Sequence, residues 1–136
     1  MEFQTHILIF FVLLSCFLSS SLAYKFYVGG RDGWVLYPSE SYSQWAERNR
    51  FQVNDTLVFM YKKWTNSMLV VNKDDYYNCN TKNPIKKLEE GDSKFQFDRS
   101  GPFFFITRKD QSCEKGHKLI VIVLVISYEL SHCLDI

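Results

Sequence analysis

Short apolar runs separated by turn residues fill most of the chain beyond residue 23. Two of these runs, Phe103–Ile106 and Leu119–Ile126, have strand length and are rich in aromatic or β-branched residues. Shorter runs and alternating segments predict further strands at Tyr24–Val28, Phe51–Val53, Thr56–Tyr61, Met68–Val71 and Lys94–Arg99. Seven or eight short strands with turn signals between them predict an all-β Greek-key sandwich.

Local signals add a tight turn and two short helices to this sandwich. Asn54-Asp55 predicts a turn that joins the two strands beside it into a pair, because Asn tolerates the left-handed conformation. Ser43–Arg48 predicts a short helix with Ser41 or Ser43 as its N-cap and Trp45 on its buried face. Lys73–Asn78 predicts a second helical turn, and we expect Trp34 in the core.

The first 23 residues have the pattern of a secretory signal peptide. Ile7–Leu18 is almost continuously apolar, and small residues ending in Ser21-Leu22-Ala23 follow it, so we expect cleavage after Ala23. An uncleaved anchor helix is the alternative, although this run is shorter than the roughly 20 apolar residues of a membrane span. The remaining chain divides into a folded domain, residues 24–127, and a short polar tail, residues 128–136.

Net charge gives no reason to expect nucleic acid or a strongly acidic partner. The chain carries 16 Lys and Arg against 15 Asp and Glu. Removing the signal segment removes only Glu2, which leaves 16 minus 14, or +2. A charge this small does not create the basic surface that nucleic-acid binding requires.

Three cysteines remain after the signal segment, since Cys16 is lost with it. Cys79 and Cys113 lie inside the strand-patterned region, and in an oxidising compartment we expect them to form a disulfide. The loop that this disulfide closes would stabilise the fold by roughly 3–4 kcal/mol. Cys133 in the polar tail is either free or paired with a second chain, which would give a disulfide-linked dimer.

Candidate chemistry concentrates in the polar loop between the two longest apolar runs, residues 107–118. Ser112 has no base beside it in sequence, and His117 is the one good metal ligand of this loop. Carboxylate pairs elsewhere, such as Asp74-Asp75, are typical of solvated turns, so we expect no enzyme. Asn54-Asp55-Thr56 is a glycosylation sequon, whose occupancy the tight turn and the acidic middle residue leave open.

Several motifs together resemble one known family over residues 24–127. They are Val28-Gly29-Gly30, Gly33-Trp34, Trp45-Ala46, Phe51–Phe59, Tyr76–Cys79, Asn83-Pro84-Ile85, Gly101-Pro102, Phe104–Ile106, Cys113–Gly116 and Lys118-Leu119. In this combination the chain resembles the phytocyanins of plants, and most of all their early nodulin-like subgroup. The resemblance implies a cupredoxin-like β-sandwich of seven or eight strands with one or two short helices and a disulfide that matches Cys79–Cys113.

Copper-binding phytocyanins hold copper with two His, one Cys and an axial Met or Gln, a ligand set suited to one-electron transfer. The positions that match the first His, the Cys and the second His hold Asn66, Thr107 and Ser112 here, and the axial position holds His117. The resemblance therefore implies vacated copper positions, with no metal site and no cofactor. We interpret His117 as an ordinary polar side chain.

The resemblance implies a copper-free, non-enzymatic protein of the secretory pathway. It would act at the plasma membrane, in the cell wall or in the extracellular space, and bind a cell-wall glycan or an extracellular or membrane protein. Blue-copper electron transfer is the alternative, which Asn66, Thr107 and Ser112 disfavour. Trp64 is the candidate side chain for stacking on a sugar ring. We expect no lipid-anchor signal in this form, because the last apolar run, Leu119–Ile126, matches the final strand.

Overall fold

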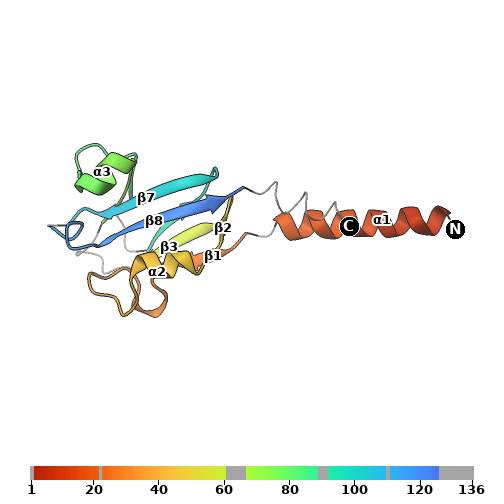
Figure 1. Cartoon of the computed structure of the whole chain (residues 1–136), viewed down its shortest axis with the longest axis horizontal. Coiled ribbons are helices and arrows are strands. Elements are labelled where there is room, and N and C mark those ends of the chain that lie inside the picture. Colours follow the sequence, from red (N-terminus) through yellow and green to blue (C-terminus); the bar gives the residue numbers. More distant parts are fainter. Residues whose placement is uncertain (1, 22, 61–66, 89–91, 110, 126–136) are drawn as a thin grey trace.

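The computed structural model describes residues 2–21, 23–60, 67–88, 92–109 and 111–125. Within them the chain forms a helix, a mostly β domain with two further short helices, and one 3-10 turn (Figure 1). The elements are α1 Glu2–Ser21, β1 Lys25–Tyr27, the 3-10 turn Gly30–Asp32, α2 Tyr42–Glu47, β2 Phe51–Gln52, β3 Thr56–Met60, β4 Met68–Val71, α3 Lys73–Asn78, β5 Lys86–Leu88, β6 Asp92–Gln96, β7 Gly101–Thr107 and β8 Lys118–Leu124.

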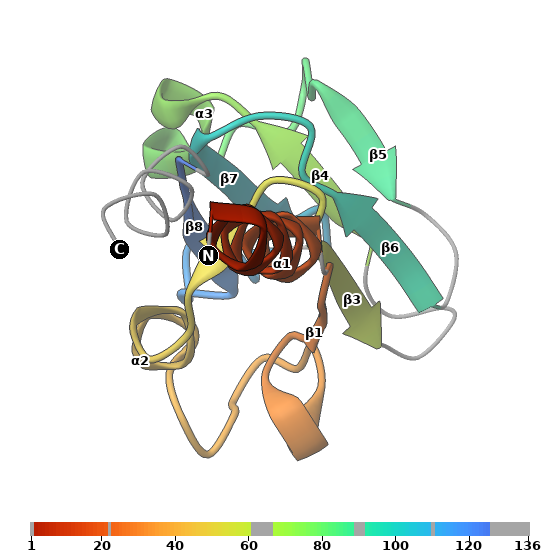
Figure 2. The same ribbon diagram turned by 90° about the vertical axis from the view of Figure 1, so that its right-hand side faces the viewer.

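The described strands form two sheets, as the alternating pattern predicts. One sheet has the order β1-β3-β6 and the other the order β2-β8-β7-β4-β5. The longest pairing joins β7 to β8 in antiparallel register, with Gly101 opposite Val123 and Ile106 opposite Lys118. Figure 2 shows the strands from the end at which α1 enters the domain. The prediction of an all-β sandwich is confirmed.

Aromatic side chains fill the space between the two sheets. Phe59, Phe97 and Phe105 are fully buried there, and the rings of Phe97 and Phe103 lie 4.9 Å apart. Large rings of this kind bury more apolar area per residue than aliphatic side chains and prefer such tilted contacts. Trp34 and Trp45 both belong to this cluster, which confirms that each is a core residue.

A second, smaller cluster lies on the outer side of the five-stranded sheet, under α3 (Figure 1). Leu69 and Val71 of β4 and Ile106 of β7 face it, together with Tyr76 of α3. Because β4 contacts an apolar cluster on each face, all four of its residues are buried, which explains its uninterrupted apolar sequence.

Two helix predictions are confirmed in place, and one of the two N-cap residues predicted for the first of them is confirmed as well. Ser41 is the N-cap of α2, and its hydroxyl accepts a hydrogen bond of 3.2 Å from the Gln44 amide. The helical turn predicted after β4 is α3, with Asn72 as its N-cap. Strand β5 was not anticipated, because the lysines at its start carry no strand pattern.

The predicted pairing of the strands on either side of Asn54-Asp55 is wrong. β2 pairs in parallel with β8, whereas β3 pairs in parallel with β1 and antiparallel with β6. The left-handed conformation of Asn54, φ 80°, is present as expected. Here it carries the chain from one sheet to the other instead of closing a hairpin, because the apolar faces of β2 and β3 pack from opposite sheets into the same core.

Residues 2–21 form α1, which lies beyond one end of the two sheets (Figure 1). None of the helices in the described ranges is both long enough and apolar enough to cross a membrane. The buried residues of both core clusters lie between Val28 and Val123. The described core is therefore built entirely from residues beyond Ala23.

Candidate functional site

Thr107 ends β7, and the resemblance stated above matches its position to that of the copper-binding Cys. Its side chain is buried, and its hydroxyl has two partners. It accepts a hydrogen bond of 3.0 Å from Nε1 of Trp34 and donates one of 2.9 Å to the backbone oxygen of His117. A single hydroxyl thus joins β7, the loop that precedes β8 and the segment that contains Trp34.

His117 immediately precedes β8 and is fully buried. Its imidazole lies parallel to the Trp34 indole, with ring centroids 4.3 Å apart. Neither ring nitrogen has a hydrogen-bond partner in the described part of the chain. Burial lowers the pKa of His117 from 6.5 to about 4, so the ring is neutral at physiological pH. The interpretation of His117 as an ordinary polar side chain is wrong, since it behaves as a packed aromatic ring.

Tyr42 completes a stack of three rings beside this imidazole. Its ring centroid lies 4.4 Å from that of Trp34 and 5.9 Å from that of His117. Its hydroxyl accepts from the amide of Val35 at 2.7 Å and lies 2.9 Å from the backbone oxygen of Gly33. Burial is the main cause that raises the pKa of Tyr42 to about 12. We call Trp34, Tyr42, Thr107 and His117 the Thr107 cluster.

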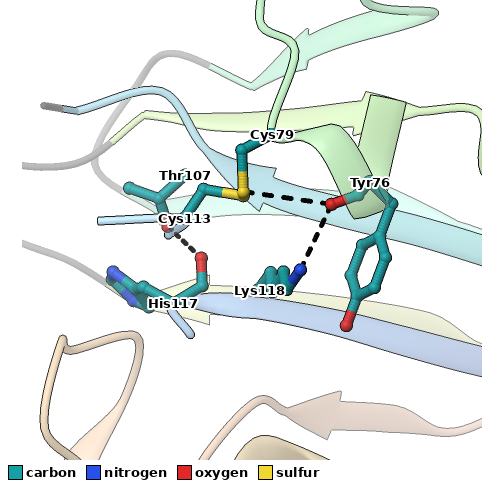
Figure 3. Close-up of a disulfide and its surroundings, with 6 residues drawn as sticks. All are labelled: Tyr76, Cys79, Thr107, Cys113, His117 and Lys118. Atoms are coloured by element: carbon teal, nitrogen blue, oxygen red, sulfur yellow. Dashed lines mark hydrogen bonds between the residues drawn. A yellow bond between two sulfur atoms is a disulfide. The ribbon is translucent and has the colours of Figure 1, made fainter. Parts of the chain in front are cut away.

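The loop around the cluster is fixed by backbone hydrogen bonds and by the disulfide that Figure 3 shows. The His117 amide donates to the Ser112 oxygen at 2.9 Å. Cys79 and Cys113 form the predicted disulfide, with Cα atoms 5.7 Å apart, which ties this loop to the end of α3. Next to it, Lys118 donates to the backbone oxygen of Tyr76 and lies 4.3 Å from the centre of the Tyr76 ring.

The structure brings together three of the four positions matched to copper ligands. Thr107, Ser112 and His117 are all buried within one loop region, while the charged loop residues Arg108, Lys109, Glu114 and Lys115 are exposed. The fourth position, Asn66, lies outside the described residues, as do Trp64 and Cys133.

Sequence reasoning placed Trp34 in the core without giving it a part in the site. The signal was present, because a buried tryptophan needs an acceptor for its indole N–H and Thr107 is the acceptor here. Tyr42, to which sequence reasoning gave no part in the site, is 4% exposed and belongs to the cluster. The sequon residue Asn54 is exposed at the turn between β2 and β3.

The Thr107 cluster offers little to a metal ion or a reacting substrate. The described positions that the resemblance matches to copper ligands supply the hydroxyls of Thr107 and Ser112 and the imidazole of His117, with no thiolate. The described ranges contain no group of three or more His, Cys, Asp or Glu side chains placed to hold a metal ion. Because neither His117 nitrogen has a partner, Ser112 and His117 form no nucleophile–base pair.

A separate hollow of about 770 Å³ lies between α2 and β8. Its wall includes Ile120, Ile122 and Leu124, which alternate with the core-facing residues of β8 and point outward. Glu47 and Arg50 also line it. This hollow does not include any residue of the Thr107 cluster.

Comparison with known proteins gives consistent matches. A family profile described as a plastocyanin-like domain matches residues 34–117. Early nodulin-like protein 1 of Oryza sativa subsp. japonica is 54% identical over 112 residues, which cover 79% of this chain and 47% of that protein. Early nodulin-like protein 4 of Arabidopsis thaliana is 57% identical over 104 residues, which cover 76% of this chain and 47% of that protein. The chain spans about half the length of these curated relatives.

Solved structures with the same fold include two cucumber proteins. Cucumber basic protein, a blue copper protein, aligns with a TM-score of 0.65 and 28% identity over 74% of this chain and 99% of that chain. Cucumber stellacyanin aligns with a TM-score of 0.67 and 26% identity over 76% of this chain and 96% of that chain. The sandwich is therefore cupredoxin-like. The family profile and the relatives above together show that the chain belongs to the phytocyanin family, in its early nodulin-like subgroup.

Proposed function

We propose that this protein is a copper-free, non-enzymatic early nodulin-like phytocyanin that acts in the extracellular space, in the cell wall or at the plasma membrane. It binds a cell-wall glycan or an extracellular or membrane protein there. The domain supplies a rigid, disulfide-linked scaffold for this binding, and electron transfer is not its activity.

The observation that carries the copper-free assignment is the role of the Thr107 hydroxyl. It occupies the position of the copper-binding thiolate, yet it accepts from the Trp34 indole and donates to the His117 carbonyl. A type 1 copper site depends on a Cys thiolate and two imidazoles. A neutral hydroxyl that already has two partners does not replace the thiolate.

Copper titration tests this assignment against the alternative of blue-copper electron transfer. Purified protein is titrated with Cu(II) while the visible spectrum is recorded, with cucumber basic protein in the same buffer as the positive control. We expect no intense blue copper–thiolate band, because the described site offers copper no thiolate. An intense blue band from this protein would support the electron-transfer alternative instead.

Passage through the secretory pathway forms part of the proposal and rests on the pattern of residues 1–23. The disulfide fits an oxidising compartment, and Asn54 is exposed in a sequon. We propose that Asn54 carries a glycan. Protein secreted from plant cells should migrate faster after treatment with an N-glycosidase, and Asn54→Gln should remove that difference. An unchanged migration of the wild type after treatment would argue against glycosylation.

Partner binding is best tested with a glycan array and the secreted domain. Trp64 is the proposed stacking residue, so Trp64→Ala should weaken binding to any glycan that the wild type retains. Tyr37, which is 79% exposed, supplies the matched control Tyr37→Ala. Equal binding by wild type and Trp64→Ala would remove Trp64 from the proposal, and no binding at all would favour a protein partner.

We also propose that the protein forms a dimer through a disulfide between the Cys133 residues of two chains. Wild-type protein should run as a dimer without reducing agent, and Cys133→Ser should run as a monomer. A monomeric wild type under the same conditions would exclude the linked dimer.

A further inference from the structure

Asp55 is a buried carboxylate whose partners include the residue that follows the expected cleavage site. It is 2% exposed. Its Oδ1 accepts a hydrogen bond of 2.9 Å from the Tyr24 amide, and its Oδ2 accepts one of 2.8 Å from the Gln52 amide. Within the described ranges no Lys or Arg side chain forms an ion pair with it. Two backbone donors thus stabilise a carboxylate that has no cationic partner among them.

Tyr24 is held in place at this carboxylate by its own backbone. Its oxygen accepts a hydrogen bond of 2.8 Å from the Thr56 amide, and the next residue, Lys25, pairs with Thr56 at the start of β1. The position of the Tyr24 nitrogen is therefore set by residues beyond it in the chain.

Hydrolysis of the Ala23–Tyr24 bond would change the chemistry of that nitrogen. Water adds across the peptide bond, so that Ala23 leaves with a carboxylate and the Tyr24 nitrogen becomes a primary amine. The amine takes up a proton and is then an ammonium group with three N–H donors. Ala23 is exposed and lies outside α1 and β1, so this bond belongs to neither element.

We propose that removal of residues 1–23 completes an ion pair between the new α-ammonium of Tyr24 and the buried carboxylate of Asp55. This inference rests on the secretory passage in the proposed function and on the cleavage after Ala23 that the sequence predicts. The ammonium places a positive charge within hydrogen-bond distance of a buried carboxylate whose side-chain hydrogen bonds, among the described residues, come from two uncharged backbone amides, and an opposite charge at that distance favours the ionised form of both groups. The processed chain is therefore more stable than a chain whose Tyr24 nitrogen is still an amide.

Three N-terminal forms of residues 24–136 test the ion pair. They are the free amine at Tyr24, the acetylated amine, and a chain extended by Ala23. The second and third keep an N–H at the Tyr24 nitrogen but carry no charge on it. We expect both to melt about 4–8 °C below the free amine, the shift typical of losing one such interaction in a domain of this size.

If the ion pair causes this difference in melting temperature, the difference must disappear when Asp55 loses its charge. In Asp55→Asn the free and acetylated forms should melt together, while the exposed Asp74→Asn control keeps the wild-type difference. Equal melting temperatures of the wild-type forms, or a difference that persists in Asp55→Asn, would overturn the proposal. If Asp55→Asn does not fold, the pKa of the Tyr24 α-amine in the wild type tests the ion pair instead. We expect it above the ordinary range of about 7.7–8.0, and a value within or below that range would overturn the proposal.

N-terminal sequencing separates this proposal from the wider one. Protein secreted from plant cells should begin at Tyr24. A different first residue would exclude the ion pair in the cell. The copper titration and the glycan array would still test the proposed function, because neither depends on the cleavage site. A blue copper band would reverse the proposed function without affecting the melting comparison.

Discussion

Thr107→Val is the most direct test of what the buried hydroxyl of Thr107 does. The substitution keeps the branched shape of the side chain and removes only the hydroxyl. Trp34 Nε1 then has no acceptor, and its side chain is fully buried. The His117 oxygen also loses a donor but keeps the Thr107 amide at 3.3 Å. The indole N–H therefore accounts for most of the expected effect.

A buried donor left without a partner costs about 1–3 kcal/mol, and we expect Thr107→Val to lower the free energy of unfolding by that amount. Urea unfolding followed by tryptophan fluorescence measures it, with an unchanged dependence on urea as the sign that only stability has altered. Thr107→Ser is the matched control, because it keeps the hydroxyl and loses one methyl group, worth about 0.8 kcal/mol.

A loss of less than about 0.5 kcal/mol in the free energy of unfolding of Thr107→Val would contradict this role of the hydroxyl. A loss that small is typical of surface substitutions. A greater destabilisation of Thr107→Ser than of Thr107→Val would contradict it too. Either result would mean that the indole N–H finds another partner and that the hydroxyl does not organise the cluster.

Three further predictions concern the same end of the domain. The pKa of His117 is lowered from 6.5 to about 4, so the stability that its neutral ring supplies is complete above about pH 6.5. It is lost as the pH falls toward 4, by roughly 3 kcal/mol at most, and His117→Phe should remove this part of the pH dependence of unfolding. Replacing Cys79 and Cys113 together by Ser should lower the free energy of unfolding by roughly 3–4 kcal/mol in the same urea assay, and a smaller loss would contradict the loop-closure argument. A chelator should leave the melting temperature unchanged, and a decrease would reveal a stabilising metal.

The sandwich could be predicted from the sequence because strand signals here are local. The alternation in β6 and β8 and the apolar run of β4 each reflect which faces are buried. The partners of β2 and β3 could not be predicted in the same way. Two strands on either side of a tight turn usually pair, and only the packing of the whole core directs them into different sheets.

For the site, the sequence predicted some of the residues that occupy it but not the contacts that they make. The family resemblance predicted that Thr107, Ser112 and His117 stand at copper-ligand positions. It did not show that the hydroxyl of Thr107 bonds to Trp34, 73 positions earlier. Nor did it show that His117 stacks on the same indole, because a single His in a polar loop is usually exposed.

On the proposed copper-free assignment, these contacts are what orders the site end of this cupredoxin-like domain. In a copper site the metal links residues from separate segments, whereas here the Thr107 hydroxyl links β7, His117 and Trp34. The His117 ring fills the space against the indole, and the disulfide anchors the loop to α3. Because these links come from the chain itself, ligand residues can be lost without loss of the fold.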